Sequence, residues 1–134
     1  MRFITYLVAA ASLVAVTPAT AQNADVGKGL YDQYCASCHG EGGKGDGPMA
    51  EFLTLKPSDL TGLAAKNDGK FPMLDVIHII DGRTGVRQHG GPMPVFGHVF
   101  MAETEDESER TYTEILATRG RVLSLATYLE TLQP

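Results

Sequence analysis

Apolar residues recur with the spacing of an α-helix in three stretches of the chain. They predict helices over residues 25–36, 72–81 and 113–132. Pro72 suits the first position of a helix and Gly82 suits a C-terminal cap, so the middle helix has signals at both ends. Gly120 is a candidate for a bend or a break in the last stretch, and a shorter helix is expected over 48–55. The predicted fold class is therefore all-α.

The first 21 residues have the pattern of an export signal. Arg2 is the one charged residue, an apolar run follows over 3–16, and the stretch ends in Ala19-Thr20-Ala21, a signal-peptidase pattern. Cleavage after Ala21 leaves residues 22–134 as a single small domain. This mature chain is expected in a bacterial periplasm, without a membrane span. An uncleaved N-terminal anchor is the alternative, although the apolar run is short for one.

The net charge of the whole chain is −5 at pH 7, from 11 Lys and Arg against 16 Asp and Glu. This balance does not suit a nucleic-acid-binding protein, which needs a basic surface. Five of the acids fall within residues 103–109. Such a run is typical of a solvated loop or of the acidic start of a helix, and it could also steer a basic redox partner. The sequence does not indicate an oligomeric state.

The strongest chemical signal is the run Cys35-Ala36-Ser37-Cys38-His39. Two cysteines three positions apart point the same way on one helical turn, and the next residue is a histidine. This is the attachment pattern for haem c, in which both thiols form thioethers with the porphyrin and the histidine becomes an axial iron ligand. A bacterial export signal agrees with this pattern, because covalent haem attachment occurs outside the cytoplasm. We therefore expect one covalent haem on Cys35 and Cys38, with His39 on its iron.

Three other interpretations of the two cysteines fit less well. A thioredoxin-like redox pair lies near a βαβ pattern, and a zinc site needs a second pair of ligands. The sequence has neither feature. A disulfide across so short a loop would constrain the unfolded chain very little.

Met93 is the expected sixth ligand of the iron. It lies between Pro92 and Pro94, where the chain cannot form a helix and is held in an extended conformation. That setting suits a rigidly presented ligand better than a core methionine, and a soft, uncharged thioether raises the reduction potential of haem. Ligation by His89 or His98 would instead give a bis-histidine haem of lower potential. The remaining methionines are less suitable: Met49, Met73 and Met101.

The haem motif and the methionine loop resemble those of class I c-type cytochromes, single-haem periplasmic proteins with His/Met ligation. The run from Gly27 to Tyr31 before Cys35 is similar to the N-terminal helix of that family. The run from Met93 to Gly97 is similar to its methionine loop, although many members have Trp at the position of Phe96. The resemblance extends over essentially the whole mature chain.

This resemblance implies the cytochrome c fold, with three to five helices wrapped around one covalently bound haem. It also implies that Gly27 allows the C-terminal helix to cross closely, with Tyr31 packed into the crossing. The matching residues of the C-terminal helix would be Leu125 and Tyr128. If Gly27 were only a poor helix residue near a helix end, these partners would not be needed.

In the family, a proline after the haem motif offers its carbonyl to the Nδ1 hydrogen of the ligand histidine. Pro48 is the expected residue and Pro57 is the alternative, while either could be a plain turn proline. The glycine-rich stretch 40–47 is expected to form a tight loop over the haem edge on the histidine side. Arg83, or Arg87, could hold a haem propionate, although a surface role for both is equally open.

These residues predict an electron carrier and not an enzyme. Both axial positions of the iron would be filled, and the sequence places no acid/base pair or nucleophile beside it. The expected partners are an electron donor and an electron acceptor of protein nature. The domain could instead be a haem subunit of a dehydrogenase or oxidase complex. If Met93 is not a stable ligand, a gas sensor or a peroxidase-like enzyme becomes the expectation.

Overall fold

The computed structural model describes residues 20–82, 93–101 and 111–134, with side chains from residue 24 onward. These residues form five α-helices, two short 3-10 helices and no strand, which confirms the predicted all-α class for this part of the chain. The α-helices are α1 (Thr20–Tyr34), α2 (Ala36–His39), α3 (Met73–Asp81), α4 (Phe96–Val99) and α5 (Tyr112–Thr131). The 3-10 helices are η1 (Ala50–Phe52) and η2 (Ala65–Asn67).

The helix boundaries differ from the prediction in several places. α1 begins at Thr20, before the predicted start, and a turn at Cys35 separates it from α2. The short helix expected over 48–55 is a single 3-10 turn. Gly120 does not end α5, which continues through it. The predicted export signal lies almost entirely outside the described residues and remains a prediction.

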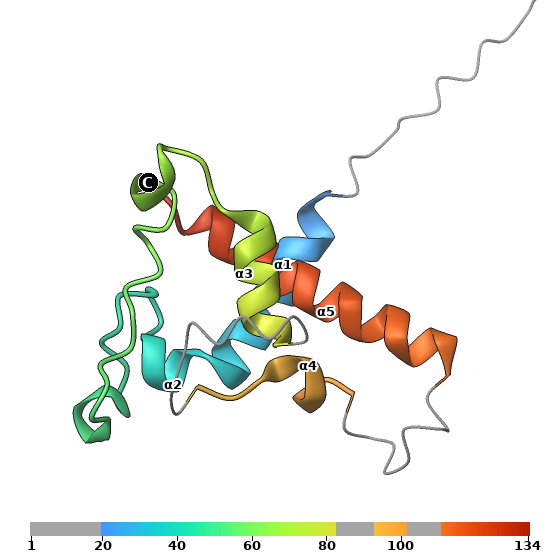
Figure 1. Cartoon of the computed structure of the whole chain (residues 1–134), viewed down its shortest axis with the longest axis horizontal. Helices are drawn as coiled ribbons and strands as arrows, with labels where there is room; N and C mark the ends of the chain where they lie inside the picture. Colours follow the sequence, from blue (N-terminus) through green and yellow to red (C-terminus); the bar gives the residue numbers. More distant parts are fainter. Residues whose placement is uncertain (1–19, 83–92, 102–110) are drawn as a thin grey trace, which may run out of the picture.

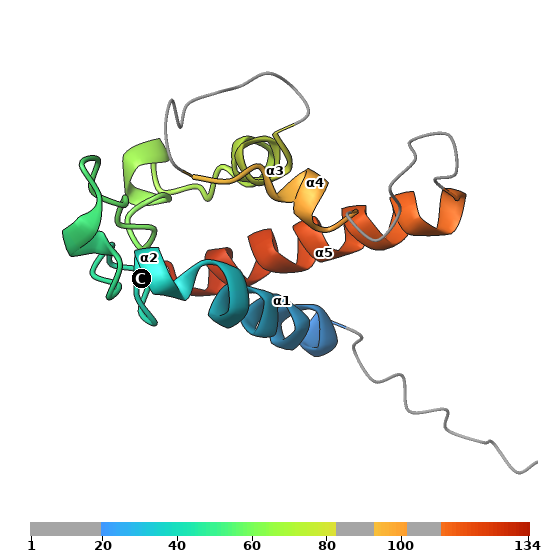
Figure 2. The same cartoon turned by 90° about the horizontal axis from the view of Figure 1, so that it is seen from below.

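The close crossing of α1 and α5 organises the fold (Figures 1 and 2). A Cβ atom on Gly27 would collide with the backbone carbonyl of Ser124 and would lie 2.8 Å from the Cβ of Tyr128. The rings of Tyr31 and Tyr128 pack with their centroids 5.3 Å apart. Leu125 is completely buried at the same crossing. The predicted role of Gly27 and its predicted partners on the C-terminal helix are therefore confirmed.

The remaining helices pack on the crossing through apolar side chains. Figure 2 shows α3 and α4 on the opposite side of α5 from α1. The ring of Tyr34 packs edge-on against Phe96 and Phe100, with centroid distances of 6.0 and 5.3 Å. Thr118 and Arg121 of α5 both donate hydrogen bonds to the Phe100 carbonyl, at 3.3 and 2.9 Å. These bonds fix the end of α4 to α5.

α5 starts with a capping box. The Thr111 hydroxyl accepts a hydrogen bond from the Glu114 backbone N–H, and the Glu114 carboxylate accepts one from the Thr111 N–H at 2.7 Å. Such a cap stabilises a helix by ~1 kcal/mol. None of the helices in the described part of the chain is both long and apolar enough to cross a membrane.

Replacing Gly27 by alanine should lower the free energy of unfolding by ~1–3 kcal/mol, because the new methyl group meets the backbone of α5. Gly29 is a matched control on the same helix, since no atom beyond its chain neighbours and the adjacent backbone of α1 lies within 4 Å of the position its Cβ would take. Gly29→Ala should raise the free energy of unfolding by ~0.5–1 kcal/mol through helix propensity alone. Urea unfolding of the purified protein, followed by circular dichroism, measures both. Equal stability of the two variants would contradict the close crossing.

Candidate haem site

The two cysteines and the histidine lie on one short helical turn directly after α1. The Cys35 N–H donates to the Tyr31 carbonyl at 2.8 Å, and the His39 N–H donates to the Cys35 carbonyl at 2.9 Å. Cys35 is buried, Cys38 is half-buried, and no disulfide joins them. Burial raises the pKa of the Cys35 thiol to about 12. The buried Cys35 thiol is therefore neutral at pH 7.

His39 is buried, and its ring is held by a backbone carbonyl. The Nδ1 atom lies 2.9 Å from the carbonyl oxygen of Ser58, with only 8% of the residue exposed. A carbonyl oxygen accepts only from a protonated nitrogen, so this bond places a hydrogen on Nδ1, and in the neutral ring the lone pair is then on Nε2. Nε2 is then the ring atom suited to bind a metal, in the orientation set by the Ser58 bond.

The partner of His39 corrects the prediction made for Pro48. The carbonyl at Nδ1 belongs to Ser58, which directly follows Pro57, the alternative residue. Pro48 is exposed, and the next residue, Met49, donates its N–H to the Ser37 carbonyl at 2.9 Å. That bond holds the chain at Pro48 beside Ser37 of α2. The carbonyl that reaches the histidine comes instead from the later segment 57–58.

The glycine-rich loop packs its backbone directly against the haem motif. Gly45 has a positive φ of 79°, and a Cβ atom there would collide with the Pro57 carbonyl. The predicted tight loop with close backbone approach is therefore confirmed. Alternate N–H groups of the loop donate to three successive carbonyls of α2: Gly45 to His39, Gly47 to Cys38 and Met49 to Ser37, at 2.8, 3.1 and 2.9 Å.

Tyr31 ties the same loop to the helix crossing. Its hydroxyl donates a hydrogen bond of 2.6 Å to the Gly40 carbonyl, immediately after the haem motif. The side chain is completely buried, and this burial raises the pKa of the phenol well above its usual value. The first residue of the loop is therefore fixed from the α1–α5 core.

Met93 is half-buried and packs against the buried apolar cluster that includes Cys35 and Phe96. The segment that follows it is held against the end of α3. A Cβ on Gly82, the left-handed cap of α3, would collide with Val95, and a Cβ on Gly97 would collide with the Asp81 carbonyl. These two close contacts leave little freedom for the chain just after Met93.

The other residues predicted to bind the iron or a haem propionate divide into two groups. His98 is exposed, and 46% of the surface of Met49 is exposed to solvent, so neither residue has the buried setting of a ligand. Arg83, Arg87 and His89 lie outside the described residues. A propionate contact by either arginine therefore remains a prediction, as does iron ligation by Met93.

Residues 22–107 match the family model described as "Cytochrome C oxidase, cbb3-type, subunit III". The matched span covers more than half of the chain and contains the haem motif and Met93. The chain belongs to this family of class I cytochrome c domains. No curated protein and no solved structure matches the chain. The predicted resemblance is thereby confirmed at the level of the domain, and haem-based electron transfer is the function that the domain implies.

The donors of this cytochrome c domain fit a covalent haem. The two thiols lie on one turn without a disulfide between them, as thioether formation requires. The Ser58 bond fixes the tautomer of His39 that an iron ligand needs. Among the described residues, no group of three or more His, Cys, Asp or Glu side chains could hold a metal ion by itself. Haem supplies reversible one-electron chemistry when bound, and the chain would supply its attachment, orientation and burial.

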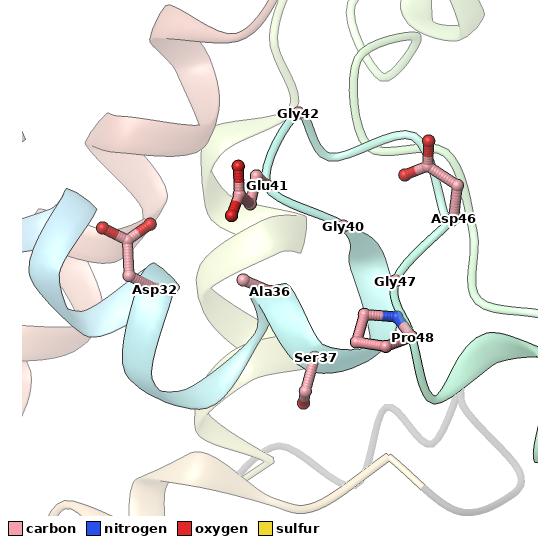
Figure 3. Close-up of a pocket in the computed structure, with 9 residues that line it drawn as sticks. All are labelled: Asp32, Ala36, Ser37, Gly40, Glu41, Gly42, Asp46, Gly47 and Pro48. Carbon is pink, nitrogen blue, oxygen red and sulfur yellow. The ribbon is translucent and has the colours of Figure 1, made fainter.

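A hollow of about 560 Å³ lies on the outer side of α2, between the end of α1 and the glycine-rich loop (Figure 3). Three carboxylates line it, from Asp32, Glu41 and Asp46. Neither thiol contributes to it, nor does His39 or Met93. The Asp32 carboxylate pairs with Lys28 at 2.6 Å on the surface. This hollow is separate from the residues that would hold the haem.

Two contributors to the site, the Ser58 carbonyl and the Tyr31 hydroxyl, were not predicted from the sequence. Any residue type can supply a backbone carbonyl acceptor. Only the turn around Ser58 could therefore have indicated its role from the sequence. That turn does have a signal: Asp59 accepts hydrogen bonds from the Thr61 hydroxyl and N–H, at 2.7 and 2.8 Å. Both bonds lower the pKa of the Asp59 carboxyl, and the bond from the Thr61 hydroxyl has the larger effect.

Tyr31→Phe should lower the free energy of unfolding by ~0.5–1.5 kcal/mol, because the buried Gly40 carbonyl loses its side-chain donor and keeps only the Gly43 N–H, at 3.1 Å. Tyr34→Phe is the matched control, since the Tyr34 hydroxyl only accepts an exposed bond from Gln33 at 3.1 Å. The control should change stability by no more than about 0.5 kcal/mol. Denaturant titrations at pH 7 compare the two, and a loss as large in the control as in Tyr31→Phe would disprove the role of the Gly40 bond.

Tyr31 should also make the protein sensitive to alkali. Its folded pKa lies above the ordinary value of 10.0, so its contribution to stability is complete below pH 10 and falls as the pH rises further. Unfolding titrations at pH 9 and at pH 11 should therefore show a larger loss of stability for the parent than for Tyr31→Phe. Identical losses for the two proteins would mean that Tyr31 does not titrate in this way.

Proposed function

We propose that this cytochrome c domain carries electrons between redox proteins of a bacterial periplasm, through one haem c. In this proposal Cys35 and Cys38 form the thioethers, and His39 and Met93 are the axial iron ligands. The observation that supports it best is the buried His39 ring, which lies on the same turn as both thiols. Its Nδ1 atom is 2.9 Å from the Ser58 carbonyl oxygen. The periplasmic location rests on the predicted export signal.

The described residues suit an electron carrier because they build a rigid site. Electron transfer is fast when the ligands of the iron move little between the two oxidation states. The His39 ring is fixed at Nδ1, and its backbone is fixed by the N–H groups of the glycine-rich loop. Donation from Nδ1 to a carbonyl also increases the basicity of the imidazole, which favours the ferric state. A soft thioether from Met93 would counter this by favouring the ferrous state.

Stable ligation by Met93 separates an electron carrier from a gas sensor or a peroxidase-like enzyme. Both alternatives need an open iron position, whereas a fixed methionine closes it. The contacts of Gly82 with Val95 and of Gly97 with Asp81 hold the chain directly after Met93, which supports a fixed ligand.

A second candidate function is that of a haem subunit within an oxidase complex. The matched family is described as an oxidase subunit, and this is the observation that favours it. Blue native electrophoresis of gently solubilised cells, with haem staining, distinguishes the two functions. A shuttle migrates near the mass of the single chain, whereas a permanent subunit migrates with a large membrane complex.

Replacing Met93 by alanine should open the sixth position of the iron. We expect the oxidised protein to lose the weak near-infrared band of methionine-to-iron ligation, and the reduced protein to bind carbon monoxide at neutral pH. Met49→Ala is the control, because Met49 is a partly exposed methionine outside the buried cluster, and it should keep the parent spectrum. A near-infrared band that survives in Met93→Ala would contradict His/Met ligation by this residue.

A further inference from the structure

Gln133, the second-last residue of the chain, joins the end of α5 to a loop about 70 residues earlier. Its side-chain Nε2 donates to the Leu60 carbonyl at 2.9 Å and to the Leu129 carbonyl at 2.8 Å. Its Oε1 accepts from the Ala64 N–H at 3.0 Å. Only one orientation of the amide satisfies two carbonyls and one N–H together. The half-buried side chain therefore acts as a specific clamp, and a purely apolar side chain could not replace it.

The clamped loop is the one that presents the carbonyl to His39. Leu60 lies two residues after Ser58, and both of its backbone groups are bound. Its N–H donates to the Gly43 carbonyl of the glycine-rich loop at 2.7 Å, and its carbonyl accepts from Gln133. The peptide after Ser58 is thus held between the haem-side loop and the end of α5.

Other contacts fix the same segment from nearby. The Asp59–Thr61 turn shapes the backbone between Ser58 and Leu60. The Pro57 carbonyl lies against the bare Cα of Gly45. Leu132, next to Gln133, packs near Gly43, since a Cβ at that glycine would lie 3.1 Å from Leu132 Cδ1. The C-terminal end of α5 therefore supports both loops that surround His39.

We propose that Gln133 is a positioning residue for His39: by holding the Leu60–Ala64 loop, it keeps the Ser58 carbonyl in hydrogen-bond contact with Nδ1. This inference rests on the proposed function, in which His39 is the axial ligand of a haem. The strength of the Nδ1 bond sets the basicity of the imidazole and so the balance between ferric and ferrous iron. A side chain just after the end of α5 thereby adjusts the reduction potential through the backbone that carries the Ser58 carbonyl.

Gln133→Met tests the proposal, because methionine keeps the length of the side chain and removes all three hydrogen bonds. We expect a higher reduction potential than in the parent, by up to about a tenfold change in the redox equilibrium, which is roughly 59 mV for one electron. In proton NMR of the reduced protein, the His39 Nδ1 proton should move upfield and exchange faster with water. Both changes follow from a longer bond to the Ser58 carbonyl.

Gln33→Met is the matched control, since Gln33 is an exposed glutamine of α1 whose amide donates only to the Tyr34 hydroxyl. It should leave the potential and the Nδ1 proton unchanged. If Gln133→Met does not retain haem, Gln133→Glu decides through the Nδ1 proton. That variant keeps an acceptor for the Ala64 N–H and loses the donors to the two carbonyls, but it also adds a negative charge that lowers the potential by itself.

Two outcomes would overturn the proposal. The first is a Gln133 variant of lower stability whose potential and Nδ1 proton match those of the control, because Gln133 would then only cap the end of α5. The second is a lower potential with an unmoved Nδ1 proton, which would indicate entry of water and not a weaker bond. A parent protein without bound haem would instead refute the proposed function, so the two failures are distinguishable.

Discussion

The close contact of α1 with α5 at Gly27 is the constraint on which the rest of this cytochrome c domain depends. Because Gly27 has no side chain, the backbone of α5 at Ser124 can approach α1 directly. This approach buries Tyr31, and the Tyr31 hydroxyl then reaches the Gly40 carbonyl just after the haem motif. One helix crossing therefore fixes where the thiols of Cys35 and Cys38 lie, since both follow α1 without a linker.

The same crossing determines where the far end of α5 lies. From there, Leu132 and Gln133 contact the glycine-rich loop and the Leu60–Ala64 loop, which lie beside His39. The environment of the histidine is thus built from backbone groups that are each held by another part of the core. A histidine held in this way has little freedom to move, and this rigidity suits the proposed role of an electron carrier.

The sequence predicted well those features that depend on side-chain type and spacing. These include the helices, the glycine at the crossing with its partners Leu125 and Tyr128, and the haem motif. The fold class followed from helical periodicity. Gly120 was a misleading signal, because α5 is held by packing along its length, and a single glycine costs a helix only ~1 kcal/mol.

The features that the sequence could not predict depend on the backbone. The carbonyl that holds His39 comes from Ser58, and any residue type could supply it. The expectation for Pro48 failed because the N–H groups of the glycine-rich loop tie that stretch to the outer side of α2, which only the folded chain reveals. The clamp by Gln133 joins residues far apart in the chain, and no local pattern marks such a pair.

The most direct test of the account is denaturing mass spectrometry of the protein purified from a host that attaches haem c, after treatment with a thiol-alkylating reagent. The account predicts the mass of one chain plus one haem, with neither Cys35 nor Cys38 alkylated. A mass without haem, with both cysteines alkylated, would contradict it.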